Sequence, residues 1–253
     1  DKLRRLWRGE SVDFRGPLGD AVSVRTQPRP VQAEVPIWLT TAGNPETYRA
    51  AARAGANVLT HLLGQSLDEV GEKIAIYRET LREEGRDPDD FKVTLMLHTF
   101  VGEDTARVRE LVRDPMKAYL GSSVSLVKNY AWAFPAFKRP QGLDATPDDV
   151  DLSVLSDEEL DAILDHAFER YFEASGLFGD VDRCVEMIER CKQVGVDEIA
   201  CLIDYGVATD DMIASLPRLK QVLERSQAIS AEARREQALA GAHSLGEQFR
   251  RHG

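Results

Sequence analysis

Five small or polar residues have the types and spacing of an anion site. They are Thr41, Ala42, Gly43, Asn44 and Thr47. Asn44 is a favourable N-cap and Pro45 suits the first helical position, so we expect a helix to begin at Pro45. A helix start presents unpaired N–H groups and the positive end of its dipole, and Gly43 lets a ligand approach the backbone closely. The loop is therefore a candidate phosphate site.

The same residues also suit an ordinary strand-to-helix turn, in which Asn44 serves only as a cap. Such turns are common, and the loop lacks the G-x-G-x-x-G and G-K-[ST] patterns of nucleotide-binding loops. The local sequence alone favours the ordinary turn.

His98 is the most informative titratable residue, because it lies in a predicted strand, residues 92–101, whose two faces differ. One face carries Val93, Leu95 and Leu97, and the other carries Thr94, Met96, His98 and Phe100. The mixed face is typical of a barrel mouth or a ligand cavity. A neutral imidazole there would hydrogen-bond a ligand and exchange protons near neutral pH. A hydrogen-bonded core histidine fits the pattern equally well.

Asp204 and His61 are expected at the ends of two other strands. Asp204 closes the predicted strand 198–204, where it would orient a substrate or cap the following turn. His61 lies near the end of the predicted strand 57–63. The histidines and carboxylates have no metal-ligand spacing, so no metal site is expected, and no nucleophile elbow is present.

Composition limits the classes of partner. The 253 residues are 43% apolar, enough for a sizeable core, and carry a formal charge of −11. Nucleic acid and anionic membranes would repel such a chain. No apolar run has the length of a membrane span, and the charged start does not resemble a signal peptide. Three cysteines without C-x-x-C spacing indicate reduced thiols, so we expect a cytoplasmic protein.

Apolar stretches predict an alternation of strands and helices. The predicted strands are residues 37–39, 57–63, 92–101 and 198–204, and the predicted helices are residues 45–54, 67–81, 104–112, 115–128, 156–174, 181–193 and 210–225. We expect a turn at 177–180, an aromatic lid or substrate wall at 129–155, and a helical linker towards a following domain at 227–253. Alternating strands and helices imply a parallel sheet, and four such units make half of an eight-unit barrel.

Several of these stretches, in this order, resemble a known family. They are WRGESVDFRG, PRPVQAEVPIWLTTAGNPETYRAAARAGANVLTHLLGQ, VTLMLHTFVGED, FERYFEASGLFG and GVDEIACLIDYGV. Together they are similar to the C-terminal half of luciferase-like flavin monooxygenases, in the branch associated with polyketide and non-ribosomal peptide synthetases. The resemblance covers roughly residues 3–225.

The resemblance implies an α/β fold, a (β/α)8 TIM barrel of which residues 1–226 form about the C-terminal half. It implies reduced FMN as cofactor and O2 as co-substrate, with one oxygen atom inserted into an amino acid or acyl substrate. The FMN phosphate would lie on Thr41, Ala42, Gly43, Asn44 and Thr47, which reverses the local preference for an ordinary turn. His98 and Asp204 are the candidate catalytic residues.

The implied partners are a small-molecule or carrier-protein-tethered substrate, a flavin reductase, the N-terminal half of the barrel and neighbouring synthetase domains. Two other functions fit the same sequence. One is hydride transfer with a flavin or deazaflavin on the same fold. The other is a non-catalytic half-barrel that serves as a scaffold within a megasynthase.

Overall fold

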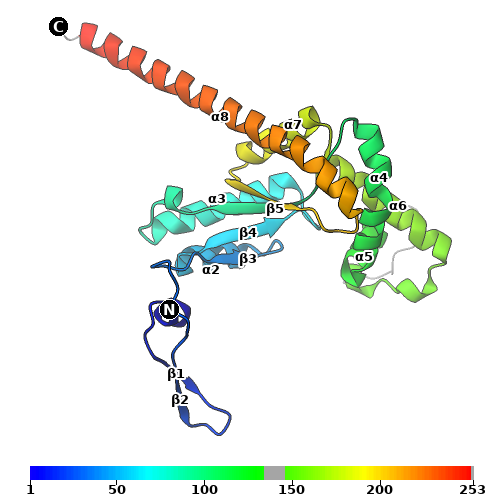
Figure 1. The fold of residues 1–253 in the computed structure, drawn as a ribbon, viewed down its shortest axis with the longest axis horizontal. Coiled ribbons are helices and arrows are strands. Elements are labelled where there is room, and N and C mark those ends of the chain that lie inside the picture. The colour runs from blue at the N-terminus through cyan, green and yellow to red at the C-terminus, as the bar shows by residue number, and fades with distance from the viewer. Residues whose placement is uncertain (134–145, 252–253) are drawn as a thin grey trace.

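A parallel sheet with helices packed against it forms the centre of the molecule (Figure 1). The computed structural model describes residues 1–133 and 146–251. The strands are β1 (Val12–Arg15), β2 (Ala21–Val24), β3 (Trp38–Thr40), β4 (Asn57–His61), β5 (Val93–Val101), β6 (Leu177–Gly179) and β7 (Glu198–Leu202). The α-helices are α1 (Lys2–Trp7), α2 (Pro45–Ala54), α3 (Leu67–Glu83), α4 (Thr105–Gly121), α5 (Val124–Ala133), α6 (Asp157–Ala174), α7 (Val181–Gln193) and α8 (Thr209–Arg251). As predicted, strands and helices alternate.

Strand β5 is the centre of the sheet. Thr94 pairs with Leu59 of β4 and with Glu198 of β7, so β4 and β7 lie on opposite edges of β5. The last three residues of β5 pair with β6, and β3 pairs with the other edge of β4. All of these pairings are parallel, whereas β1 and β2 form a separate antiparallel hairpin.

Strand β6 corrects the prediction of a turn at residues 177–180. Leu177–Gly179 is fully buried and adds a fifth strand to the four that were predicted. A three-residue strand is too short to show a period of two, so its pairing with β5 comes from tertiary contacts.

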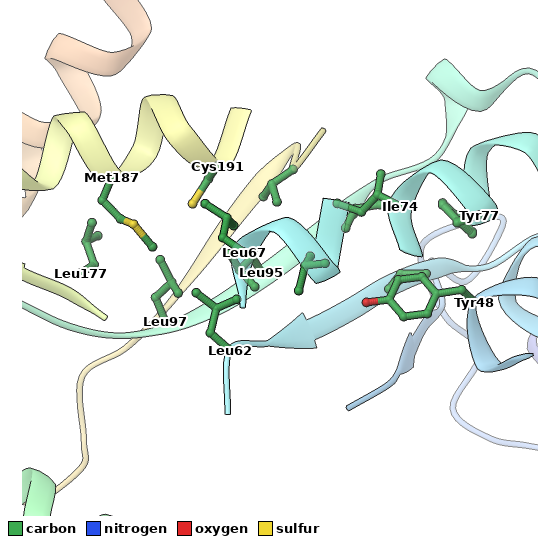
Figure 2. Packing of buried hydrophobic residues seen from close by; sticks show 14 of the residues in the cluster. Tyr48, Leu62, Leu67, Ile74, Tyr77, Leu95, Leu97, Leu177, Met187 and Cys191 are labelled. Atoms are coloured by element: carbon green, nitrogen blue, oxygen red, sulfur yellow. The ribbon is translucent and has the colours of Figure 1, made fainter. Parts of the chain in front are cut away.

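The two faces of β5 pack differently, as predicted. Leu95 and Leu97 are fully buried in a core formed with α3 and α7, and Figure 2 shows them near Leu67 of α3 and Met187 of α7. Phe100, on the opposite face, belongs to a second core with α4 and α6. Helices α3 and α7 therefore cover one face of β5, whereas α4 and α6 cover the carboxyl-terminal part of the opposite face, at His98 and Phe100.

Helix starts follow the predicted caps. Ser66 and Ser156 each form a capping box with the glutamate three residues later, so α3 and α6 begin where the sequence indicated. Asn44 caps α2, and Gly55 ends it in the left-handed conformation with φ 58°.

Helix α4 corrects the prediction of two helices separated at Pro115. The helix is continuous, with Pro115 in its interior. Four apolar residues at spacings of four, Val108, Val112, Met116 and Leu120, are all buried on one side. Burial of that stripe outweighs the cost of an interior proline, which is about 3 kcal/mol.

Helix α8 is also longer than predicted, because it continues through residue 226 without a break. The Lys192 ammonium of α7 donates to the Ser226 carbonyl at 2.9 Å and to the Ser230 hydroxyl at 2.7 Å. These contacts hold the helix against α7 beyond the predicted end at residue 225. The linker role of residues 227–253 stays a prediction, and residues 134–145 of the predicted lid lie outside the described part.

Candidate active site

The predicted anion loop connects β3 to α2 at the carboxyl edge of the sheet. The Asn44 Oδ1 atom accepts the Glu46 N–H at 2.9 Å, so this oxygen caps the helix and leaves the Asn44 amide N–H2 for a ligand. Thr41 is buried, Thr47 is half-buried, and Ala42 is exposed. The structure thus brings the five predicted loop residues together at one helix start.

Lys73 and Gln65 lie against this loop, although sequence reasoning did not select them. A Cβ atom placed on Gly43 would lie 3.2 Å from the Gln65 Oε1 atom and 3.6 Å from the Lys73 Nζ atom. Gly43 also has φ 144°, a conformation that side chains disfavour. The glycine therefore keeps open a cradle between the loop and an ammonium group.

Gln65 holds the Lys73 ammonium in place through hydrogen bonds of its side-chain amide. Its side chain is 9% exposed, and its Nε2 donates to the Thr60 hydroxyl at 3.2 Å and to the His61 carbonyl at 2.6 Å. Its Oε1 accepts from Lys73 Nζ at 2.7 Å. Glu69, one turn before Lys73, is engaged with the Ser66 backbone at 2.6 Å. No motif marks Lys73, because α3 brings it to the loop only through tertiary packing.

His98 is fully buried within three tyrosine rings. Its Nδ1 lies 2.7 Å from the Tyr171 hydroxyl, and its ring centre lies 4.3 Å from that of Tyr119 and 5.3 Å from that of Tyr205. Among the described residues, neither His98 Nε2 nor the Tyr205 hydroxyl has a hydrogen-bond partner. Desolvation, with a smaller contribution from the His61 charge, lowers the pKa of His98 to about 4. The imidazole is therefore neutral at pH 7.

His61 and Asp204 differ from their predicted settings. β4 ends at His61 instead of residue 63, and His61 Nδ1 accepts the Leu63 N–H at 3.2 Å. β7 ends at Leu202 instead of residue 204, which leaves Asp204 exposed in the following connection. The strands stop early because the chain turns towards the next element. From this connection Tyr205, which was not selected, contacts His98.

The anion loop and the residues around His98 lie along the carboxyl edge of the sheet, because all strands of a parallel sheet end on the same side. The loop after β3, His61 at the end of β4, His98 near the end of β5 and Tyr205 after β7 lie along it. In barrels of this class the carboxyl edge is the active-site face. The edge offers an anion cradle and, further along, a neutral buried imidazole.

Most of the chain matches one known protein family. A family model described as luciferase-like monooxygenase matches residues 1–198. The chain belongs to the luciferase-like monooxygenase family. Members of this family are enzymes, oxidoreductases that use reduced FMN or F420. No curated protein matches the chain.

Solved luciferase-like structures share the fold at low sequence identity. The monooxygenase RslO1 from Streptomyces bottropensis is 18% identical with a TM-score of 0.58, and the match covers 88% of this chain and 58% of that one. The coenzyme F420-dependent tetrahydromethanopterin reductase from Methanopyrus kandleri is 16% identical with a TM-score of 0.56, covering 83% and 56%. The oxygenating constituent of 3,6-diketocamphane monooxygenase from Pseudomonas putida, in complex with FMN, is 16% identical with a TM-score of 0.53, covering 85% and 57%.

The luciferase-like chain therefore spans little more than half the length of these structures. The predicted α/β fold, a part of a luciferase-like TIM barrel, is confirmed. The described helices include none with the length and apolarity to cross a bilayer. Within residues 1–133 and 146–251, no three metal-ligating side chains cluster.

Proposed function

We propose that this chain is the C-terminal half-barrel of a monooxygenase that uses reduced FMN and O2 to hydroxylate an amino acid or acyl substrate. Reduced FMN, when bound, supplies the electrons with which O2 is activated. The residues of this chain hold the cofactor, exclude water and manage protons. The observation that carries the proposal is the Lys73 ammonium held above the Gly43 loop at the start of α2.

The residues of the loop fit the phosphate of FMN. Ala42 and Gly43 supply backbone N–H groups, Asn44 and Thr47 supply side-chain donors, and the α2 dipole favours an anion. Lys73 adds a full positive charge from a second helix. Because Gln65 is neutral, it orients this charge without cancelling it. A dianionic terminal phosphate is the ligand group that these features suit best.

In this proposal His98 is the proton-handling residue. Its neutral imidazole holds a hydrogen bond to Tyr171 through Nδ1 and keeps Nε2 for a ligand or a water molecule. Asp204, exposed at the same edge, would orient the substrate. The alternative for His98 is a core histidine, which its complete burial favours.

The substrate context rests on the sequence resemblance alone. We propose a substrate tethered to a carrier protein in secondary metabolism, a flavin reductase as electron source, and the N-terminal half of the barrel with neighbouring synthetase domains as partners. These partners would supply what a half-barrel lacks, including the rest of the pocket around the flavin ring.

Flavin binding with and without the phosphate tests the proposal. The longer polypeptide that includes the preceding reading frame is titrated with FMN and with riboflavin, and flavin fluorescence reports binding. We expect FMN to bind at least about tenfold more tightly, because a charge-assisted phosphate contact contributes about 1.5–3 kcal/mol. Lys73→Met should remove most of this difference.

Lys92→Met is the matched control. Lys92 is exposed and directly precedes β5, so it lies at the amino ends of the strands, away from the loop at their carboxyl ends. It should leave the preference for FMN unchanged. Equal affinity of the unmodified protein for FMN and riboflavin would contradict the phosphate site.

Hydride transfer with a deazaflavin is the second candidate function, favoured by the structural match to the F420-dependent reductase from Methanopyrus kandleri. Oxygen uptake separates the two, since only the monooxygenase consumes O2 when its cofactor is reduced. Tight binding of F420 without oxygen uptake would favour the reductase. Failure of the longer polypeptide to bind either cofactor would favour a scaffold.

A further inference from the structure

Three arginines line one cavity at the amino ends of the strands. The cavity has a volume of about 420 Å³, and it is lined by Arg4 of α1, Arg53 of α2 and Arg86 after α3. Ile37 and Ala56, which also line it, directly precede β3 and β4. It is therefore separate from the anion loop, which follows β3. Small-molecule sites have volumes of about 300–1,000 Å³, so the cavity is large enough for a ligand.

The fold holds two of these side chains at the carboxyl end of α2, where α1 lies against it (Figure 1). The Arg4 guanidinium donates to the Ala54 carbonyl at 3.0 Å and to the Gly55 carbonyl at 2.6 Å. Arg86 Nη2 donates to the Arg53 carbonyl at 3.4 Å. Gly55 has φ 58°, and a Cβ atom placed on it would lie 2.9 Å from Arg86 Nη1. The glycine thus ends the helix and leaves room for a guanidinium group beside it.

Capping of α2 accounts for only part of this arrangement. The carbonyl groups at a helix end attract a cation, and Arg4 supplies one. The side chain of Arg53, however, makes no hydrogen bond or ion pair within the described part of the chain. Each guanidinium group has five N–H donors, so protein groups use only a minority of the donors around this cavity.

A shortage of carboxylates does not explain the unpaired guanidinium groups. The chain has 43 acidic and 32 basic residues. Close by in the sequence, Arg5, Arg8 and Arg82 each pair with a glutamate. Of the described residues that line the cavity, only Asp1 carries a carboxylate. The three guanidinium groups and this one carboxylate leave a net charge of +2 on the lining side chains.

The rest of the cavity wall is apolar. It consists of Leu3, Ile37, Leu39, Ala54 and Ala56. Guanidinium groups bind phosphate through two parallel hydrogen bonds, whereas apolar side chains contact the carbon skeleton of a ligand. A molecule that suits both parts of the wall carries a dianion on an apolar group.

We propose that this cavity, the arginine pocket, binds a small organic phosphate monoester. The phosphate would lie among the three guanidinium groups, and its charge of nearly −2 above pH 7 matches the net charge of the lining. The apolar group of the ester would lie against Ile37 and Leu39. Because the proposed cofactor site lies at the carboxyl ends of the strands, the arginine pocket is a second, independent site.

Calorimetric titration with phenyl phosphate at pH 7.5 tests the pocket. The protein is the longer polypeptide that includes the preceding reading frame, with Lys73→Met in place so that the anion loop has lost its ammonium group. Phenyl phosphate should bind at least about tenfold more tightly than phenol, because the charged hydrogen bonds require the phosphate. It should also bind more tightly than inorganic phosphate, which lacks the apolar part, and than 2-phenylsuccinate, which carries two separate carboxylates.

Substitution of Arg53 locates the ligand without disturbing the fold, because its side chain bonds to no other described group. In the same background, Arg53→Met should weaken the binding of phenyl phosphate about tenfold. Arg53→Lys retains the charge without the planar fork and should lose less. Arg190→Met is the matched control, since Arg190 is exposed in the last turn of α7, and it should leave the affinity unchanged.

Three outcomes would overturn the arginine pocket. The first is that the longer polypeptide does not bind phenyl phosphate. The second is equal affinity in the Arg53→Met and Arg190→Met variants, which would place the ligand elsewhere. The third is that phenol, inorganic phosphate or 2-phenylsuccinate binds as tightly as phenyl phosphate. Because every titration is made without the Lys73 ammonium, failure of the proposed cofactor site would leave these results unchanged.

Discussion

At the scale of single residues, the contact between Gln65 and Lys73 explains why the loop favours a negatively charged ligand. A carboxylate in place of Gln65 would neutralise the ammonium, whereas a carboxamide holds it at 2.7 Å and leaves its charge intact. Gly43 is required beneath it, because any side chain would enter the space beside the ammonium. Three residues from separate elements thus form one cradle.

His98 should make the folded protein less stable in mild acid. Its pKa is about 4 in the folded chain, against 6.5 for an unperturbed histidine, so between these values only the unfolded chain binds the proton. The free energy of unfolding should therefore fall as the pH drops from 6.5 towards 4, by up to about 3 kcal/mol from this residue. Urea unfolding at several pH values measures the slope.

His98→Gln is the informative variant, because an amide retains a partner for Tyr171 but does not titrate. Between pH 6.5 and about 4, the free energy of unfolding of this variant should change less steeply with pH. The difference in slope should correspond to about one proton fewer taken up on unfolding. A variant whose pH dependence matches that of the natural chain would show that His98 does not carry the effect.

At the scale of elements, α4 and α6 are joined by rows of opposite charge. The cations Arg109, Arg113 and Lys117 of α4, at spacings of four, face the carboxylates Asp161, Asp165, Glu169 and Glu173 of α6. Arg109 and Arg113 also lie over the rings of Phe172 and Phe168, at 4.3 and 4.8 Å. The charges therefore align two helices that already share an apolar core.

Arg113→Met should destabilise this pair of helices by about 1 kcal/mol, since the ion pairs are partly exposed but the ring contact is desolvated. Methionine preserves most of the apolar stem. Arg8→Met, which removes the exposed pair with Glu34, is the control and should change stability by less than about 0.5 kcal/mol. Urea unfolding measures the stability of both variants. An equal loss of stability in the two would contradict a stabilising role of the charge row between α4 and α6.

At the scale of the whole molecule, the sheet in the described part has one face covered by helices and two strand edges without a partner strand. The outer face of the sheet is covered by helices and carries the main core, whereas the β3 and β7 edges are unpaired. An unpaired strand edge presents N–H and C=O groups that can pair with another strand. The anion cradle lies at the carboxyl edge of this sheet, where the loop between β3 and α2 meets Gln65 and Lys73.

The three thiols should report whether the core forms in residues 1–253 alone. Burial raises the pKa of Cys184 and of Cys191 to about 12, and both are enclosed by the main core. Cys201 is exposed, although desolvation raises its pKa too. At pH 8.5 a chromogenic disulfide should react with one thiol in the native chain and with three in guanidinium. Rapid reaction of all three without denaturant would show that the core is not formed.

The sequence by itself determined the features that depend on near neighbours. The caps at Asn44, Ser66 and Ser156 and the two faces of β5 were predicted from residues within a turn or a strand of one another. The five loop residues were also predicted to gather, because one helix start holds them together. Their role as a cofactor site stays a prediction.

Only the tertiary structure decided the features that join distant segments. β6 became a strand by pairing with β5, α4 remained one helix because its stripe is buried, and Lys73 reached Gly43 through the packing of α3. His98 acquired its three tyrosines from α4, α6 and the connection after β7. Such contacts depend on the register of strands and the docking of helices, and these are fixed by the summed burial of many side chains instead of by any local pattern.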